Sequence, residues 1–241
     1  MRIINREIFE DLRKYKTYKI MTFPGLHNII FDKLFKNIDK TSKILVLSSG
    51  SGAFEARLHD NGFTNIYSSE YDTNSILFNK SKKIYCLNVN DHEFHKKIEE
   101  KFDVVVATEV IEHLYSHHNF IFCCYHLLNK GGVVIITTPN TQSLISRLSF
   151  LLKGYPLFFH TPPKKFGHIS PVFESYFIFL SNLNKFDVSE KFTCCNYLDL
   201  IIITSPIRIL KLVVLLPLVM LLTILNKGFF DFIKVFKLNK R

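Results

Sequence analysis

Three side chains that could do chemistry lie close together in the middle of the chain: Glu109, Glu112 and His113. Their spacing of i, i+3 and i+4 would place all three on one face of a helix. Two carboxylates and an imidazole could hold Mg²⁺, Mn²⁺ or Zn²⁺. Alternatively, His113 could act as a general base whose pKa is adjusted by the neighbouring acids. A third interpretation is structural, because acids at the start of a helix stabilise its dipole and His113 would then be a bystander.

A second candidate site is the small-residue turn Ser48-Ser49-Gly50-Ser51-Gly52, which follows the apolar run 44–47. The run predicts a strand buried on both faces. Gly50 and Gly52 have no side chain, so backbone N–H groups there can approach a ligand closely. A helix predicted over 53–61 would direct its positive end to the same place. The pattern favours a site for an anionic or carboxylate-bearing cofactor, although a tight turn without a ligand has the same appearance.

Polar residues also close the next two predicted strands. Glu70 follows the strand 65–69, and a carboxylate there can accept hydrogen bonds from both ribose hydroxyls; a solvated loop acid is the alternative. Asn88 follows the strand 84–87, where its amide could pair with the edge of an adenine. The backbone N–H of Val89 could do the same.

The elements that must position these residues alternate along the chain. Further strands are predicted over 102–107 and 133–137, with helices over 92–101 and 109–128. This alternation predicts an α/β fold with a Rossmann-like, doubly wound, mostly parallel sheet and helices on both faces. Residues 173–203 return to a helix-then-strand pattern that would complete the sheet.

We expect three parts in the chain. Residues 1–40 form an N-terminal helical cap, in which an amphipathic helix over 28–38 packs on the sheet or lies over the cofactor site. Residues 41–204 form the main domain. Within it, the stretch 141–172 is rich in Pro and Gly and is predicted to be a lid or substrate loop with a short helix over 144–152. Residues 205–241 form an apolar and basic C-terminal segment.

The C-terminal segment predicts association with a membrane. The chain has a net charge of +10, and residues 206–241 hold seven Lys and Arg against one Asp. The uncharged run 212–225 is shorter than the roughly 20 residues that span a bilayer. The Phe- and Lys-rich residues after it suit anionic lipid headgroups as a surface segment. We therefore expect a monotopic or re-entrant apolar helix, ahead of a true span or a core or dimer helix, and consider nucleic acid an unlikely partner.

The remaining composition agrees with a location at the cytoplasmic face of a membrane. The N-terminus is charged from the start and shows no signal peptide. The five cysteines lie in apolar surroundings without metal-binding spacing, which indicates free thiols in a reducing compartment. The sequence does not predict the oligomeric state.

The phrase Glu-Val-Ile-Glu-His-Leu over 109–114 and the Gly-Gly…Thr-Pro-Asn ending over 131–140 make a resemblance specific. With the turn at 48–52, they resemble the class I S-adenosylmethionine-dependent methyltransferases over about residues 40–200. The branch in question includes ubiquinone-type O-methyltransferases and small-RNA 2′-O-methyltransferases. The resemblance implies S-adenosylmethionine as cofactor, bound by Ser48, Ser49, Gly50, Gly52, Glu70, Asn88, Val89 and Thr108.

The resemblance also implies a possible divalent metal ion. In some members of the branch, the matching Glu-x-x-Glu-His binds a metal with a further His from a later loop. Here these residues are Glu109, Glu112 and His113, with His168 of Gly167-His168-Ile169-Ser170 as the further ligand. Without a metal, His113 with Glu109 would be the catalytic pair.

The chain departs from the family at two positions. The family usually has an acid at position 46, which helps to position the amino-acid end of the cofactor, and Gly at position 48; this chain has Val46 and Ser48. A methyltransferase-like scaffold without activity is therefore the non-enzyme alternative.

The favoured function is O-methylation of a small-molecule acceptor that is membrane-proximal or lipid-linked, such as a saccharide. The stretch 146–154 before Gly-His-Ile-Ser is similar to bacterial methyltransferases of surface-polysaccharide assembly. Quinone-precursor O-methylation and RNA 2′-O-methylation are the alternatives.

Overall fold

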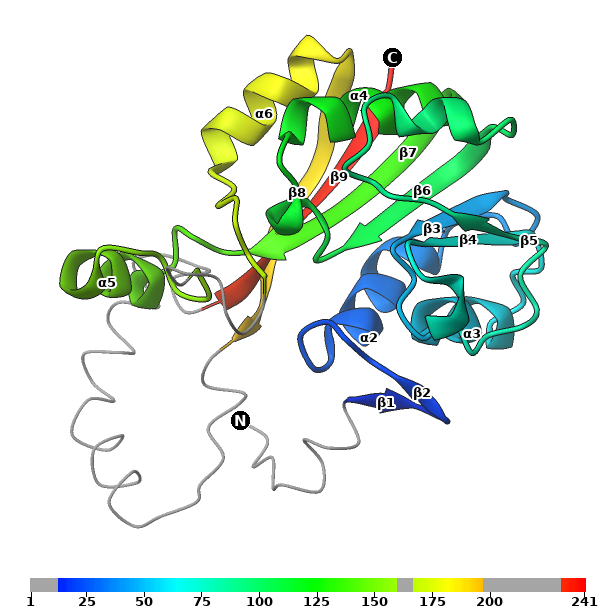
Figure 1. Cartoon of the computed structure of the whole chain (residues 1–241), viewed down its shortest axis with the longest axis horizontal. Helices are drawn as coiled ribbons and strands as arrows, with labels where there is room; N and C mark the ends of the chain where they lie inside the picture. Colours follow the sequence, from blue (N-terminus) through cyan, green and yellow to red (C-terminus); the bar gives the residue numbers. More distant parts are fainter. Residues whose placement is uncertain (1–12, 160–166, 197–230) are drawn as a thin grey trace.

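The computed structural model describes residues 13–159, 167–196 and 231–241. Its centre is a seven-stranded sheet with the order β5-β4-β3-β6-β7-β9-β8 (Figure 1). The strands are β3 (Ile44–Leu47), β4 (Ile66–Glu70), β5 (Lys83–Cys86), β6 (Phe102–Thr108), β7 (Leu128–Pro139), β8 (Phe186–Asn196) and β9 (Asp231–Lys240). Strands β3 to β7 pair in parallel, and β9 runs antiparallel to both β7 and β8. The predicted α/β fold with a mostly parallel sheet is confirmed.

Helices cover both faces of this sheet. On one face lie α2 (Leu26–Ile30), continued by the π-helical turn Phe31–Phe35, and α3 (Ala53–Asp60); on the other lie α4 (His117–Leu127) and α6 (Glu174–Leu183) (Figure 1). Because side chains alternate along a strand, Leu45 and Leu47 join the core on the α4 side. Ile44 and Val46 join the core on the α2 side. This double burial explains why β3 reads as an uninterrupted apolar run.

The N-terminal region is only partly helical. It begins with a hairpin of β1 (Lys14–Tyr15) and β2 (Tyr18–Lys19), which precedes α2. The Tyr15 hydroxyl donates to Asp60 at the end of α3 (2.8 Å), and the Arg57 guanidinium lies over the Tyr15 ring. The predicted helical cap over 1–40 is therefore wrong for the hairpin, and residues 1–12 lie outside the described chain.

Two predicted helices are shorter than expected. Only the 3-10 turn Phe94–Lys97 forms within the predicted helix 92–101. Within 109–128, α4 begins at His117 because the side chain of Ser116 accepts the Asn119 N–H and caps it. Before it lies a separate 3-10 turn, Ile111–His113. Glu109 precedes this turn with a left-handed φ of 53° and is in no helix.

The last described residues form a strand inside the sheet, next to the edge strand β8. The described residues after position 230 were expected to form a surface segment, but β9 lies between β7 and β8 and buries Phe232, Val235 and Phe236. The strand is apolar on both faces, because Phe236 and Leu238 join the core on the α4 side and Ile233 and Val235 join the core on the α2 side. Lys234 is satisfied by Glu174, with 2.6 Å between Nζ and Oε2. The sheet therefore extends beyond the 41–204 range predicted for the domain.

The predicted helix over 144–152 is confirmed as α5 (Leu144–Lys153), which begins at the Ser143 cap and ends at Gly154. Within the ranges 13–159, 167–196 and 231–241, no helix has the length and apolarity needed to cross a membrane. The predicted membrane-associating run 212–225 lies outside these ranges.

Candidate active site

The turn after β3 has the tight geometry that its small residues suggest. Ser48, Gly50 and Gly52 all have left-handed φ values, of 53°, 54° and 84°. A Cβ on Gly52 would lie 2.4 Å from the Cβ of Phe78, so only glycine fits there. Ser48 takes the left-handed conformation despite its side chain, at a cost of about 1 kcal/mol. The replacement of glycine at position 48 has thus not prevented the turn from forming.

Glu70 ties the end of β4 to this turn. Its Oε2 accepts the Gly50 N–H at 2.8 Å, and its Oε1 accepts the Tyr71 N–H at 2.9 Å. The parallel pairing of β3 with β4 brings the two strand ends to the same edge of the sheet. The carboxylate is therefore held where a ribose could meet it.

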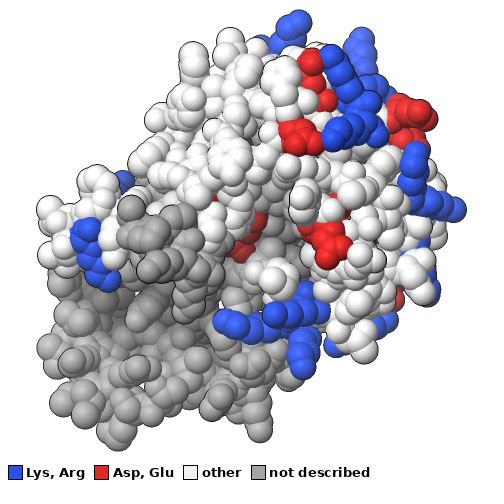
Figure 2. Space-filling view, in the orientation of Figure 1, with Lys and Arg blue, Asp and Glu red and all other residues white. Residues whose placement is uncertain are grey.

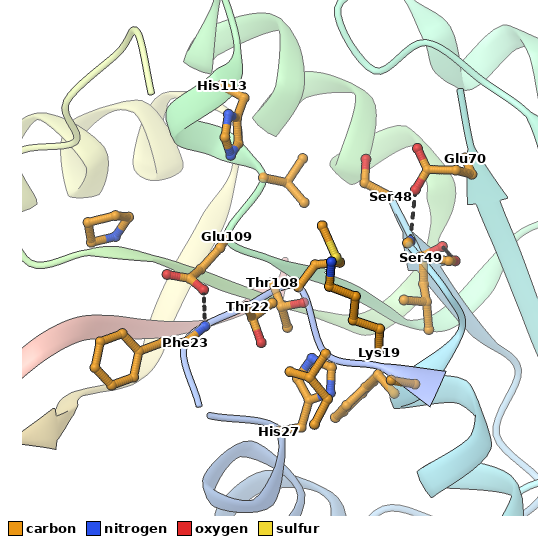
Figure 3. A pocket seen from close by; sticks show the side chains of 18 of the residues that line it. Lys19, Thr22, Phe23, His27, Ser48, Ser49, Glu70, Thr108, Glu109 and His113 are labelled. Carbon is orange, nitrogen blue, oxygen red and sulfur yellow. Dashed lines mark hydrogen bonds between the residues drawn. The ribbon is translucent and has the colours of Figure 1, made fainter. Parts of the chain in front are cut away.

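A cavity of about 780 Å³ opens at this edge of the sheet. Figure 2 shows the hollow in this face of the molecule, with acidic side chains beside it. One side, which we call the strand-end wall, consists of Ser48, Ser49, Gly50, Glu70 and Thr108. A second group of lining residues, which we call the N-terminal wall, consists of Met21, Thr22, Phe23 and His27. Figure 3 labels the last three.

The structure brings most of the predicted cofactor residues together. Besides the strand-end wall, Val89 lines the cavity. Two predicted residues do not line it. Gly52 lies behind the turn against Phe78, and the Asn88 side chain accepts the Asn90 N–H at 3.0 Å, which stabilises a local turn. Asn90 lines the cavity instead and was not predicted.

Glu109 links the two walls. Its Oε2 accepts the Phe23 N–H at 2.5 Å (Figure 3), and its own N–H donates to Thr137. Burial raises the pKa of the Glu109 carboxyl to about 7. A carboxyl with this pKa exchanges protons near neutral pH.

His113 also lines the cavity, and its ring packs edge-on against the ring of His168. Its Nδ1 is 3.1 Å from the Gly167 carbonyl oxygen, and its ring centroid is 4.7 Å from that of His168. A carbonyl oxygen can only accept, so Nδ1 carries the proton and Nε2 of the neutral ring has the lone pair. Burial lowers the pKa of His113, which keeps the ring neutral at pH 7.

The predicted metal-binding set is only partly assembled. Glu112, His113 and His168 each offer a ligand atom within 4.8 Å of the others. Glu109 is not in this group, and the predicted shared helical face is wrong because Glu109 precedes the 3-10 turn. Burial and the charge of Glu109 raise the pKa of Glu112 well above its usual range. Two imidazoles and a carboxylate suit a divalent transition-metal ion, which would have to displace the Glu112 proton.

The N-terminal wall was not predicted residue by residue. Its members come from residues 21–27, ahead of the amphipathic helix that the sequence indicated. The one signal was His27, a polar residue directly before an apolar helical face. A single histidine in such a place is usually structural, so the pattern did not single it out.

Comparison with known proteins gives the family. The family model described as "Methyltransferase domain" matches residues 26–176, more than half of the chain. The ubiquinone biosynthesis O-methyltransferase of Rattus norvegicus mitochondria is 51% identical over 45 residues, covering 19% of this chain and 13% of that protein. The Glaesserella parasuis ubiquinone biosynthesis O-methyltransferase is 34% identical over 62 residues, covering 24% and 26%. The chain thus aligns with only a small part of these relatives.

Solved structures agree on the fold. A SAM-dependent methyltransferase from Archaeoglobus fulgidus has a TM-score of 0.61 at 16% identity, covering 89% of this chain and 94% of that one. Magnesium protoporphyrin IX methyltransferase from Synechocystis, with bound SAH, has a TM-score of 0.59 at 10% identity, covering 89% and 82%. We conclude that the chain belongs to the methyltransferase domain family.

Proposed function

We propose that the protein transfers a methyl group from S-adenosylmethionine to a hydroxyl oxygen, with His113 as the general base. The observation that carries this proposal is the His113 ring in the cavity, whose Nδ1–H is held by the Gly167 carbonyl. A hydroxyl nucleophile must lose its proton, and an imidazole with a fixed tautomer suits this task. The ubiquinone biosynthesis relatives are named as O-methyltransferases, which supports oxygen as the acceptor atom.

The residues that line the cavity would have different roles in the reaction. Glu70 and the turn at 48–50 would hold the cofactor, whose sulfonium supplies an activated methyl group. His113 Nε2 would take the hydroxyl proton while the new O–C bond forms and the S–C bond breaks. Because the leaving group is already charged, much of the rate depends on holding the reactants close and in line. Glu109 is the second candidate base, held by the Phe23 N–H.

The test is to replace His113 and His168 separately by Ala and measure turnover and cofactor binding. With His113 as the base, His113→Ala lowers kcat about 10²- to 10³-fold and leaves cofactor affinity within about twofold, because Glu70 and the turn are untouched. His168→Ala then has a much smaller effect. Unchanged turnover in both variants would contradict the proposal for these histidines.

A metal-assisted reaction is the second candidate, favoured by the grouping of Glu112, His113 and His168. A bound divalent ion would lower the pKa of the acceptor hydroxyl through its positive charge. In that case a chelator abolishes turnover, Mn²⁺ or Mg²⁺ restores it, and His168→Ala is as damaging as His113→Ala. Full activity after chelation would exclude this candidate.

For the acceptor, we propose a membrane-proximal or lipid-linked molecule, at the cytoplasmic face of a membrane. Residues 197–230, which include the apolar run 212–225, separate β8 from β9. The two ends of that stretch, Asn196 and Asp231, are partners in register. They lie at the edge where β7 ends, since Pro139 of β7 pairs with Ile233 and also lines the cavity.

The helix α5 supports the same proposal. It leaves the sheet just after β7, and its Leu151 and Leu152 are 77% and 78% exposed. Arg147 and Lys153 on the same helix could contact anionic headgroups. The exposed leucines of α5 would thus face a bilayer.

Sedimentation with vesicles containing anionic lipid tests this proposal. We compare the full chain with a variant in which a two-residue Asn-Gly turn replaces 197–230, a change that the pairing of Asn196 with Asp231 allows. The full chain is expected to sediment with vesicles, and the variant to bind much more weakly. A full chain that stays in the supernatant would contradict membrane association. Product analysis with a labelled methyl donor and membrane extracts would separate saccharide from quinone-precursor acceptors.

A further inference from the structure

Two buried polar side chains in the N-terminal wall lack a hydrogen-bond partner. His27 is 5% exposed, and within the described chain neither of its ring nitrogens has a partner. The Thr22 hydroxyl oxygen is also buried and has no hydrogen-bond partner among the described residues. Both residues line the cavity, and Figure 3 shows the His27 ring beside it. Buried polar groups nearly always form hydrogen bonds. Two buried groups without a hydrogen-bond partner at one cavity therefore indicate a ligand that forms hydrogen bonds with them.

The position of these groups indicates which part of a ligand they would meet. In Figure 3, Glu70 lies at the upper right of the cavity, and His27 lies below it with Thr22 above the His27 ring. Glu70 is placed for the ribose, so the other polar end of the cofactor must find its partners away from Glu70. On this side β3 offers only the apolar Val46. A ligand bearing an ammonium and a carboxylate would have no polar partner from that strand.

We propose that His27 and Thr22 form the subsite for the amino-acid end of S-adenosylmethionine, in place of an acid at position 46. This inference rests on the cofactor assignment and does not depend on the identity of the acceptor. A neutral imidazole has one donor and one acceptor, and a hydroxyl has both. Together they can donate to the carboxylate and accept from the ammonium.

Two alternatives for His27 are distinguishable. Burial lowers the pKa of His27 to about 3, so the ring recognises its ligand through hydrogen bonds and not through a positive charge. Lys19 also lines the cavity and is exposed, and it could attract a carboxylate by charge alone. A purely structural His27 would serve only its edge-on packing against Phe54, with 5.1 Å between ring centroids. Phenylalanine would preserve that packing.

The experiment compares two probes by calorimetric titration of the full chain. S-adenosylhomocysteine carries the amino-acid end, and 5′-methylthioadenosine lacks it. We expect His27→Phe to weaken the binding of S-adenosylhomocysteine at least tenfold and the binding of methylthioadenosine less than twofold. Thr22→Val is expected to weaken the binding of S-adenosylhomocysteine more than that of methylthioadenosine, with a smaller difference between the two probes than in His27→Phe. Glu70→Gln is the matched control and weakens both probes to a similar extent, because both contain the ribose.

The thermal midpoint gives an independent readout. His27→Phe is expected to keep or raise it, because the variant removes two orphaned polar atoms and retains the ring. Unchanged affinity for S-adenosylhomocysteine in the variant, or an equal loss for both probes, would overturn the subsite. If His27→Phe does not fold, Thr22→Val decides on the same criterion. A wild-type chain that binds neither probe would instead contradict the cofactor assignment.

Discussion

The two walls of the cavity are built in different ways. The strand-end wall follows directly from the parallel sheet, because the ends of β3, β4 and β6 meet at one edge. The N-terminal wall comes from a segment that precedes the sheet in sequence. It is tied to the site by the hydrogen bond from the Phe23 N–H to the Glu109 carboxylate and by that from the Ser51 hydroxyl to the Lys19 carbonyl. The first wall is thus fixed by topology, and the second by a few contacts that a single substitution can remove.

The largest effect is expected at Gly52, in the turn behind the strand-end wall. Gly52→Ala places a methyl group 2.4 Å from the Phe78 Cβ at a φ of 84°. We expect a loss of about 3 kcal/mol of unfolding free energy and at least tenfold weaker cofactor binding, measured by urea unfolding and calorimetry. The matched control is Gly62→Ala, whose φ is 90° but whose added Cβ meets nothing within 4 Å. It should cost about 1 kcal/mol; equal costs would show that the turn is not tightly packed.

The second prediction concerns Glu55, which supports the strand-end wall from behind. It is fully buried, and its Oε1 accepts from the Ser68 hydroxyl at 3.1 Å. Burial raises the pKa of Glu55 from 4.5 to about 7. The raised pKa means that the folded state favours the protonated acid below about pH 4.5, and this contribution is lost as the pH rises through about 7.

Replacing Glu55 by Gln removes that titration while keeping the shape of the side chain. Relative to the wild type, Glu55→Gln should gain stability between about pH 4.5 and 7 and then level off. The gain should reach at most about 3 kcal/mol, at 1.36 kcal/mol for each pKa unit. Urea unfolding at pH 5 and pH 8 measures it. The same stability difference at both pH values would mean that Glu55 titrates normally.

The smallest effect is expected at the link between the walls. Glu109→Leu removes the acceptor of the Phe23 N–H, whereas Glu109→Gln retains an oxygen there. Loss of this bond should speed hydrogen exchange of the Phe23 amide about tenfold, which corresponds to about 1.4 kcal/mol. The Gln variant should exchange near the wild-type rate. Wild-type exchange in the Leu variant would mean that the Glu109 carboxylate does not hold the N-terminal wall.

The same contrast explains what the sequence could predict. The strands around Val46, Val105 and Ile135 are strongly apolar and end in turns, so their number and direction could be predicted. Glu70 followed from its place at the end of a strand. The helix expected over 109–128 failed because Ser116 caps a later start, which moved Glu109 into a loop.

Long-range contacts account for the remaining errors. The apolar residues of β9 were visible in the sequence, but lysines recur among them at every third position and an apolar run precedes them, so they were assigned to a lipid surface. The contacts of Phe23 with Glu109 and of His27 with the cavity join positions far apart in sequence. Local periodicity contains no information about such pairs.

The decisive measurement is calorimetric titration of the full wild-type chain with S-adenosylhomocysteine. Saturable binding to one site in the micromolar range is expected, because the turn forms despite Ser48 and the strand-end wall is in place. Absence of binding at millimolar ligand concentration would contradict it and would favour a methyltransferase-like scaffold without activity.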